Sequence, residues 1–359
     1  MKKIILVFLL LSMGLLTAAC GDDDSENGQL RIAVGYGEWE SALGIQISET
    51  FEYLAEEFDV EIVEFLMGGG EDGLAAVESL LAGGGIDGII AITWDVARQL
   101  TADRHQVPVV TALQFPSEAE IGSIAAFNTF LGGVIDDEFW AGYQAMRALY
   151  LSGSRNVTWS GLTTGFSQSH DDRTRGAMHF IAENPNMNLL AESYTMGLWH
   201  EDVIAFAAIF PEMDGMAFTS VNIGVYSMME IEGIADGSVR IAGPDIAART
   251  GEMFEKGVQV WSCGGQHATA MIGFAVLYNY LMDGTRIIPD PLTPIQRNYL
   301  EITSFEDYLE FAAVIESPLY SAQDIRQLIR YYNSAATFDD FVRGGREFSL
   351  DNIRMRRGN

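Results

Sequence analysis

Short runs of β-branched and other apolar residues alternate with longer amphipathic runs through most of this chain. The first short run, Leu30–Tyr36, precedes a stretch in which apolar residues recur at three- and four-residue spacings, which is the period of a helix. Three further rounds of the same kind follow, and the last short run is Val107–Leu113. Repeated alternation of strand and helix favours a parallel sheet with helices on both faces.

A second series of strands and helices begins after Gly132 and Gly133 and continues to about Ile246. It is followed by a helical pattern over Ala268–Met282 and, beyond Ser304, by further helical pieces. A chain of 359 residues is too long for one comfortable hydrophobic core, which favours two domains. The sequence therefore predicts an α/β protein with two Rossmann-like lobes, each built on its own parallel sheet.

The first 20 residues have the layout of a secretory signal. Two lysines precede an apolar run that is short for a transmembrane span, and the small residues 17–19 lead to Cys20. A cysteine directly after small residues resembles a bacterial lipobox, in which Cys20 is acylated and anchors the mature chain. Thr17 departs from the usual residue of a lipobox, which leaves ordinary secretion as the alternative. Residues 21–29 are polar and charged enough to form a flexible tether.

The charge of the chain restricts its partners. It carries 50 acidic and 21 basic residues, a formal net charge of −29, which argues against attraction to nucleic acid or anionic lipid. Cys20 and Cys263 are the only cysteines, so an acylated Cys20 leaves no pair for an intrachain disulfide. We therefore expect an extracytoplasmic, lipid-anchored protein that binds no nucleic acid and is stabilised by packing.

Several motifs occur in the order found in a known family. They are VIDDEFWAGYQAM, DDRTRGAMHFI, DGMAFTSVN, VRIAGPDI and GVQVWSCGGQHATA. Over about Arg31–Thr303 the chain resembles the type I periplasmic binding proteins, the ribose- and galactose-binding receptors of ABC importers. The resemblance implies a first lobe of residues 30–133 and 268–294, and a second lobe of residues 134–267 and 295–359 that includes a helical C-terminal extension. It also implies three crossovers between the lobes and a ligand cleft at the carboxyl ends of the strands.

Arg173 is the central candidate for ligand contact. It follows the predicted strand Asn156–Leu162 and opens the predicted helix Asp172–Asn184. By resemblance to the family it points into the cleft, where a planar guanidinium can hold two ligand oxygens, so its removal is expected to weaken binding and barely change folding. The alternative is a solvated first turn capped by a preceding aspartate. Arg175 is expected to pair with a carboxylate.

Aromatic and polar residues follow several of the predicted strands and are further candidates for binding a sugar. The full set of proposed ligand-binding residues is Trp39, Trp94, Asp95, Gln114, Phe115, Asp137, Arg173, Trp199, Asn222, Asp245 and Gln266. Indole rings can stack on sugar rings and the polar groups can hydrogen-bond to hydroxyls, whereas the alternatives are ordinary packing and helix capping. Many pentose and hexose receptors carry an Asp-Arg pair where this chain has Leu113 and Gln114, which argues against a simple ribose-like site.

Catalytic chemistry finds little support in the sequence. His170, Asp171 and Asp172 are adjacent, so a helix or turn spreads them around its axis, and no second histidine cluster completes a metal site. Cys263 has no activating partner besides His267, which favours a buried thiol. We expect no enzyme activity, no cofactor and no metal, and a monomer that delivers a small polar ligand to an ABC permease. The alternatives are a sensory receptor of the same fold, a nucleoside or autoinducer-type receptor, and a secreted hydrolase.

Overall fold

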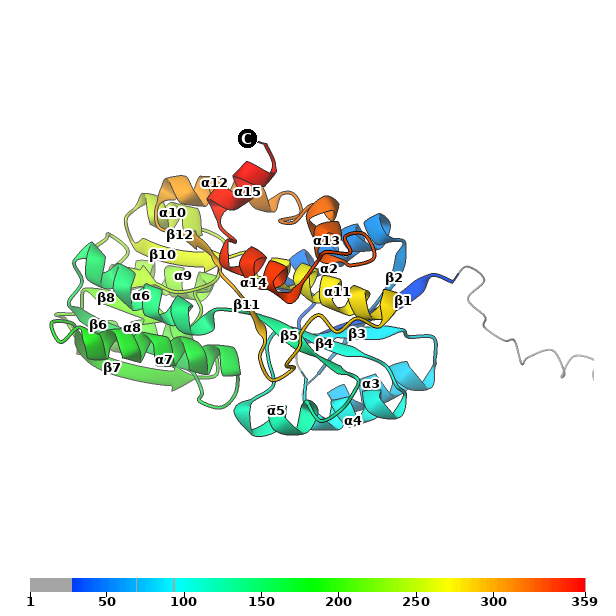
Figure 1. The fold of residues 1–359 in the computed structure, drawn as a ribbon. Coiled ribbons are helices and arrows are strands. Elements are labelled where there is room, and N and C mark those ends of the chain that lie inside the picture. The colour runs from blue at the N-terminus through cyan, green and yellow to red at the C-terminus, as the bar shows by residue number, and fades with distance from the viewer. Residues whose placement is uncertain (1–27, 69, 93, 359) are drawn as a thin grey trace, which may run out of the picture.

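The computed structural model describes residues 28–358 apart from 69 and 93, and the chain forms two α/β lobes (Figure 1). The first lobe contains β1 (Leu30–Tyr36), α2 (Ala42–Phe58), β2 (Val60–Leu66), α3 (Gly70–Ala82), β3 (Gly88–Ala91), α4 (Val96–Arg104), β4 (Val109–Leu113), α5 (Glu118–Ile124), β5 (Phe130–Asp136), α11 (His267–Asp283) and β11 (Ile295–Arg297). The second contains α6 (Glu138–Ser152), β6 (Asn156–Leu162), α7 (Gln168–Glu183), β7 (Asn188–Thr195), α8 (Trp199–Ile209), β8 (Gly215–Phe218), α9 (Ile223–Ile231), β9 (Arg240–Ala242), α10 (Thr250–Glu255), β10 (Gln259–Gly264) and β12 (Leu300–Ile302). The C-terminal segment contains α12 (Phe305–Ile315), α13 (Ala322–Leu328), α14 (Phe338–Arg346) and α15 (Leu350–Arg356).

Each lobe is built on a six-stranded sheet. The strand orders are β11-β5-β4-β3-β1-β2 and β12-β10-β9-β8-β6-β7. Neighbouring strands are parallel except for β10 and β12, which run antiparallel. In the first lobe α2 and α11 cover one face of the sheet, and α3 and α4 cover the other (Figure 1). The predicted fold of two lobes with parallel sheets is confirmed.

Helix α11 is the most deeply buried helix of the first lobe. Every residue from His267 to Asn279 is buried, because the helix lies against α2 on one side and against β3, β4 and β5 on the other. Its apolar residues therefore belong to the core of the lobe. Among the described residues, no helix combines the length and apolar character that a membrane span requires.

Helices α6 and α7 pack unusually closely in the second lobe, and two glycines make this possible. A Cβ atom at Gly142 would lie 1.7 Å from the carbonyl oxygen of Arg173, and one at Gly176 would lie 1.9 Å from the carbonyl oxygen of Phe139. Both positions therefore exclude a side chain, and the contact holds the backbone of α7 against α6. This fixes the place of Arg173 relative to the start of α6.

The chain crosses between the lobes later than the sequence predicts. Strand β5 continues to Asp136, so the predicted boundary between residues 133 and 134 falls inside a strand of the first sheet. The segment from residue 295 also begins in the first sheet, where Ile295 pairs with Val134, and only β12 joins the second sheet. The first and third crossovers therefore lie next to Asp137 and at Asn298–Tyr299, because backbone pairing continues up to these points.

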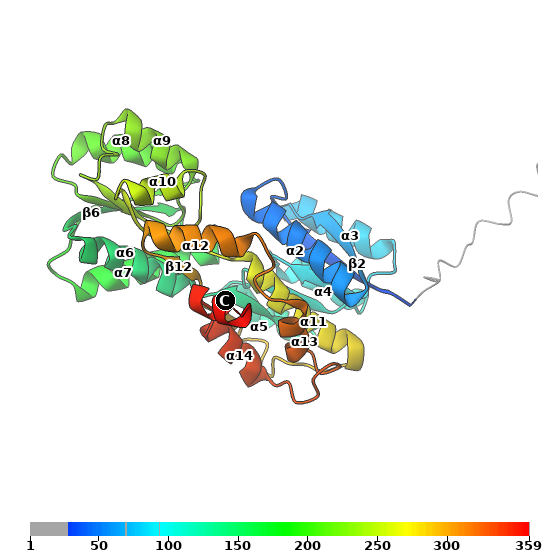
Figure 2. The same ribbon diagram turned by 90° about the horizontal axis from the view of Figure 1, so that it is seen from above.

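The C-terminal segment contacts both lobes rather than the second lobe alone, which corrects the predicted assignment of residues 295–359 (Figure 2). Helix α12 packs on α10 and β12, α13 packs on α11, and α14 packs on β11. Ile325 and Ile329 belong to the same apolar cluster as Phe58 of the first lobe. Arg326 also donates to the Glu57 carboxylate at 3.1 Å. Burial of these apolar side chains thus holds the segment against the first lobe as well as the second.

Candidate functional site

Polar side chains from three loops and one helix meet at the carboxyl edge of the second sheet. Asp245, which follows β9, accepts hydrogen bonds from Ser220 Oγ and Gln266 Nε2, each at 2.5 Å. Nη1 of Arg173 lies 3.8 Å from the same carboxylate. Asp245 has a φ of 75°, a left-handed conformation that aspartate tolerates better than most residues. The predicted residues Arg173, Asp245 and Gln266 are thus brought together.

The first lobe contributes Tyr36 to this region. Tyr36 ends β1, and burial raises the pKa of its phenol, with further increases from the charges of Glu38 and Asp245. Tyr36 stands at the carboxyl end of β1, as Asp245 follows the carboxyl end of β9 in the other lobe. Trp39 packs edge-on against Tyr36, with ring centroids 5.7 Å apart, and donates its indole N–H to the Phe65 carbonyl. Trp39 therefore lies beside the candidate site.

Arg173 is bound by protein groups on three sides. Its Nε donates to Glu138 Oε2 at 2.5 Å, Nη1 donates to the Thr219 carbonyl at 2.7 Å, and Nη2 donates to the Tyr299 hydroxyl at 2.9 Å. The residue is 5% exposed. Burial raises the pKa of the Glu138 carboxyl to about 7, although the Arg173 guanidinium opposes this rise. A direct contact of Arg173 with a ligand stays a prediction.

The helix that carries Arg173 starts earlier than the sequence predicts. It begins at Gln168, so Arg173 lies in its second turn instead of opening the first. The Asp171 carboxylate accepts a hydrogen bond from the Gly165 N–H at 2.9 Å, which secures the loop before the helix. Asp172 pairs with Arg175, which confirms that Arg175 has a carboxylate partner. The helix thus includes four residues before the predicted start at Asp172.

A second buried ion pair lies next to this network at the crossovers. Arg297 of β11 pairs with Asp136 of β5 and also donates to Thr269 Oγ1 at 2.8 Å and to the Gly265 carbonyl at 2.9 Å. Both charged side chains are 0% exposed. Burial raises the pKa of Asp136 to about 6, and the Arg297 charge limits that rise. The first crossover therefore begins beside Asp136 and the third begins beside Arg297. The second, which runs from β10 to α11, includes Gly265.

A small pocket of about 220 Å³ opens between the lobes beside these networks. Gln114, Phe115 and Pro116 line it from the first lobe, and Gln168 and Arg175 line it from α7. The predicted residues Gln114 and Phe115 thus face the second lobe across a pocket.

The remaining predicted residues have the contacts that packing and capping require. Trp94 is 6% exposed and donates its indole N–H to Gln99 Oε1 at 2.8 Å, within the apolar cluster under α3 and α4. Asp95, Asp137 and Asn222 accept hydrogen bonds from backbone N–H groups three residues later, and each caps a helix. Trp199 begins α8 and is 8% exposed. These contacts explain Trp94, Asp95, Asp137 and Asn222 without a ligand, whereas the buried indole N–H of Trp199 has no hydrogen-bond partner among the described residues. The roles of these residues in binding stay predictions.

The groups considered for catalysis are separated or buried. The His170 ring stacks with Trp199, whereas Asp171 and Asp172 have the partners described above. Burial raises the pKa of the Cys263 thiol, so the predicted buried thiol is found. Within the part of the chain that the structure describes, no three His, Cys, Asp or Glu side chains are grouped to hold a metal ion.

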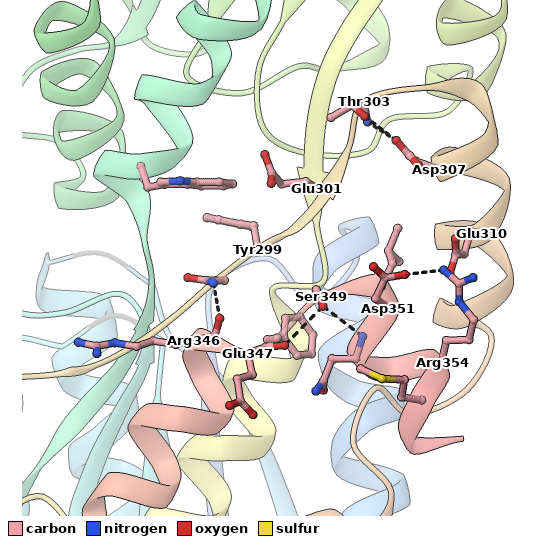
Figure 3. A pocket seen from close by; sticks show the side chains of 16 residues that line it. Tyr299, Glu301, Thr303, Asp307, Glu310, Arg346, Glu347, Ser349, Asp351 and Arg354 are labelled. Atoms are coloured by element: carbon pink, nitrogen blue, oxygen red, sulfur yellow. Dashed lines mark hydrogen bonds and ion pairs between the residues drawn. The ribbon is translucent and has the colours of Figure 1, made fainter. Parts of the chain in front are cut away.

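A larger pocket of about 800 Å³ lies between α6, the crossover strands and the C-terminal helices (Figure 3). Many of its charges already have partners: Arg354 pairs with Glu310 at 2.8 Å and with Asp351 at 2.7 Å, and Asp307 accepts from Thr303. None of the predicted ligand-binding residues lines it. We therefore place the candidate site at the strand ends between the lobes.

Sequence reasoning missed four residues of this region: Tyr36, Glu138, Ser220 and Tyr299. Tyr36 and Ser220 stand at or just after strand ends, so the rule that selected the other candidates could have found them. Glu138 and Tyr299 are 161 residues apart in the sequence, and nothing local marks them as partners of Arg173.

Solved structures share this architecture. A periplasmic solute-binding protein of an ABC transporter from Actinobacillus succinogenes, with bound D-allose, has a TM-score of 0.68 at 18% identity and covers 78% of this chain and 100% of its own. A solute-binding protein from Bacillus halodurans, with bound myo-inositol, has a TM-score of 0.65 at 17% identity, with coverages of 80% and 98%. A galactofuranose binding protein has a TM-score of 0.66 at 16% identity, with the same coverages. No family model and no curated protein matches the chain.

The architecture and these likenesses define the class as a two-lobed α/β protein with parallel sheets and three crossovers between its lobes. The particular fold is that of the type I periplasmic binding proteins.

Proposed function

We propose that the protein is an extracytoplasmic solute-binding lipoprotein, which holds a sugar or sugar-like ligand between its lobes and delivers it to an ABC importer. The observation that supports this most is the cluster of Ser220, Asp245 and Gln266 at the carboxyl edge of the second sheet, while Tyr36 stands at the carboxyl end of a first-lobe strand. Hydroxyl, carboxylate and amide groups beside an aromatic ring can orient a polyhydroxylated ligand through hydrogen bonds and apolar contact.

The comparisons support the class of ligand. Two of the similar structures contain D-allose and myo-inositol, and a third is a galactofuranose binding protein. D-Allose and myo-inositol are uncharged rings that carry several hydroxyl groups. Such a ligand requires no metal and no reactive nucleophile, and it can be released unchanged.

Calorimetric titration of the chain that starts after Cys20 tests the proposal. The panel consists of D-allose, D-galactose, myo-inositol, nucleosides and amino acids. We expect a sugar or cyclitol to bind, and Asp245→Asn to weaken that binding about tenfold or more through loss of a charge-assisted hydrogen bond. Tight binding of a nucleoside alone would favour the nucleoside-receptor alternative, and turnover of a ligand would favour an enzyme.

The lipid anchor is a separate part of the proposal, and it depends on Cys20, which lies outside the described residues. Cys20→Ser is expected to move the protein into the soluble fraction and to abolish its partition into detergent. A wild-type protein that is already soluble and cleaved at another position would contradict the anchor. That result would leave the ligand-binding part of the proposal intact.

A further inference from the structure

Several side chains at the carboxyl edge of the second sheet have buried polar atoms without a hydrogen-bond partner among the described residues. Besides Oγ of Ser167, just before α7, they are Nδ1 of His170, Nε1 of Trp199 and Oγ1 of Thr219. The residues come from the first turn of α7, the first position of α8 and the position after β8. Trp199 is 8% exposed and Thr219 is 0% exposed. Buried polar atoms are normally paired, so unpaired ones at an edge where ligands bind indicate a binding role.

His170 and Trp199 lie side by side at the carboxyl edge of the second sheet. Their ring centroids are 6.2 Å apart, and the ring planes differ by 14°. His170 precedes Arg173 by three residues in α7, so the two side chains leave the helix on the same face. Arg173 in turn donates to the Thr219 carbonyl and lies 3.8 Å from Asp245. The two rings therefore extend the polar cluster of the second lobe.

The chemistry of the two rings favours an uncharged partner. Burial lowers the pKa of His170, and the positive charge of Arg173 contributes to the same shift. Together they bring the pKa to about 3, so the imidazole is neutral at physiological pH. A neutral imidazole offers one donor and one acceptor nitrogen, and an indole offers one donor. A hydroxyl group can donate and accept, so it can pair with both rings. A carboxylate only accepts, so it could pair with both rings only in the tautomer that carries the proton on Nδ1, whereas a hydroxyl group suits either tautomer.

We propose that His170 and Trp199 form a hydroxyl-recognition pair, in which Nδ1 of the imidazole and Nε1 of the indole hydrogen-bond to hydroxyl groups of an uncharged ring-shaped ligand. His170 is then a specificity-determining residue, which the sequence does not predict. The inference rests on the proposed function, because it assigns these atoms to the ligand of the same site.

Calorimetric titration of wild-type protein and three variants tests the pair, with the tightest binder among D-allose, D-galactose and myo-inositol as the probe. His170→Ala and Trp199→Phe are each expected to weaken binding about tenfold. Trp199→Phe keeps an aromatic ring and removes the N–H, so it reports on the hydrogen bond. The matched control is His179→Ala, which changes an exposed histidine on the same helix that pairs with Glu183. It should change the affinity by less than about twofold.

Deoxy analogues of the same probe separate recognition from a structural effect. The analogue that lacks the recognised hydroxyl should bind wild-type protein about tenfold more weakly, whereas His170→Ala should bind it as well as the parent compound. If His170→Ala fails to fold, Trp199→Phe is titrated with the same analogues and decides the question. Equal losses for every deoxy position in wild-type and variant proteins would overturn the pair and leave the proposed function standing. A wild-type protein that binds no member of the panel would overturn both.

Discussion

Arg173 and Glu138 form a buried ion pair across the interface of α6 and α7, with Nε and Oε2 2.5 Å apart. Tyr299, on the crossover between β11 and β12, donates to the same Oε2 at 2.8 Å and accepts from Arg173 at 2.9 Å. One tyrosine therefore contacts both members of the pair. This arrangement links the candidate site to a segment through which the lobes are connected.

Arg173→Ala is expected to destabilise the protein by about 3 to 5 kcal/mol, because it leaves the buried Glu138 carboxylate without its charged partner. This differs from the sequence-based expectation that folding would barely change, since the sequence does not show the three protein groups that bind the guanidinium. Urea denaturation measures the loss. Glu138→Gln together with Arg173→Met should recover part of it, because both charges are then absent.

Arg175→Ala is the matched control on the same helix. The Arg175 side chain is 60% exposed and pairs with Asp172 at the surface, so its removal should change the free energy of unfolding by less than about 1 kcal/mol. The sequence suggests the opposite order, with Arg175 as the more structural of the two arginines. Equal destabilisation by the two substitutions would contradict the assignment of the buried role to Arg173.

Gly142→Ala is expected to disrupt the contact between α6 and α7. The added Cβ atom would lie 1.7 Å from the Arg173 carbonyl oxygen, so the helices must separate, at a cost of about 1 to 3 kcal/mol or more. Gly122→Ala in α5 is the control, because a Cβ atom there meets nothing within 4 Å and alanine favours a helix. Thermal unfolding should show a lower midpoint for the first variant and an unchanged or higher one for the second.

Phe348→Ala is expected to loosen the C-terminal segment from the crossovers. The ring is 1% exposed, and the guanidinium carbon of Arg297 lies 4.1 Å from its centroid. Removal of a buried phenylalanine costs about 3 to 5 kcal/mol, and here it also removes a cation–π contact. Met355→Ala, at a side chain that is 70% exposed, should be nearly neutral in the same denaturation experiment. Similar midpoints for both variants would show that the segment does not stabilise the crossovers.

The strands were the most predictable part of the fold. The expected runs Leu30–Tyr36 and Asn156–Leu162 agree with the observed strands residue for residue, because their β-branched and apolar residues end at turn-forming ones. The division of the run from Ile295 into β11 and β12 was missed. Two three-residue strands that join different sheets leave no periodic signal, and only backbone pairing with distant strands defines them.

The candidate site was predictable only where position along a strand is informative. Asp245 and Gln266 follow β9 and β10, and the rule that ligands bind beyond the carboxyl ends of parallel strands finds both. The partners of Arg173 come from α6, from the loop after β8 and from a crossover, and no local pattern connects them. The same rule also selects Asp95 and Asp137, whose backbone contacts are those of helix caps.

The stability of the protein should depend on pH through His170. Its pKa falls from the ordinary value of 6.5 to about 3 on folding, so the native state binds fewer protons than the unfolded state between these values, and acid favours unfolding. The loss should begin as the pH falls through about 6.5 and be complete near pH 3. His170→Asn cannot titrate, so the stability of wild-type protein relative to this variant should drop by about 2.7 kcal/mol between pH 7.5 and pH 4.5. Urea denaturation of both proteins across this range measures the difference. His267 is also buried with a lowered pKa, but both proteins contain it, so its effect cancels. A difference that stays constant with pH would mean that the imidazole titrates alike in the folded and unfolded chains.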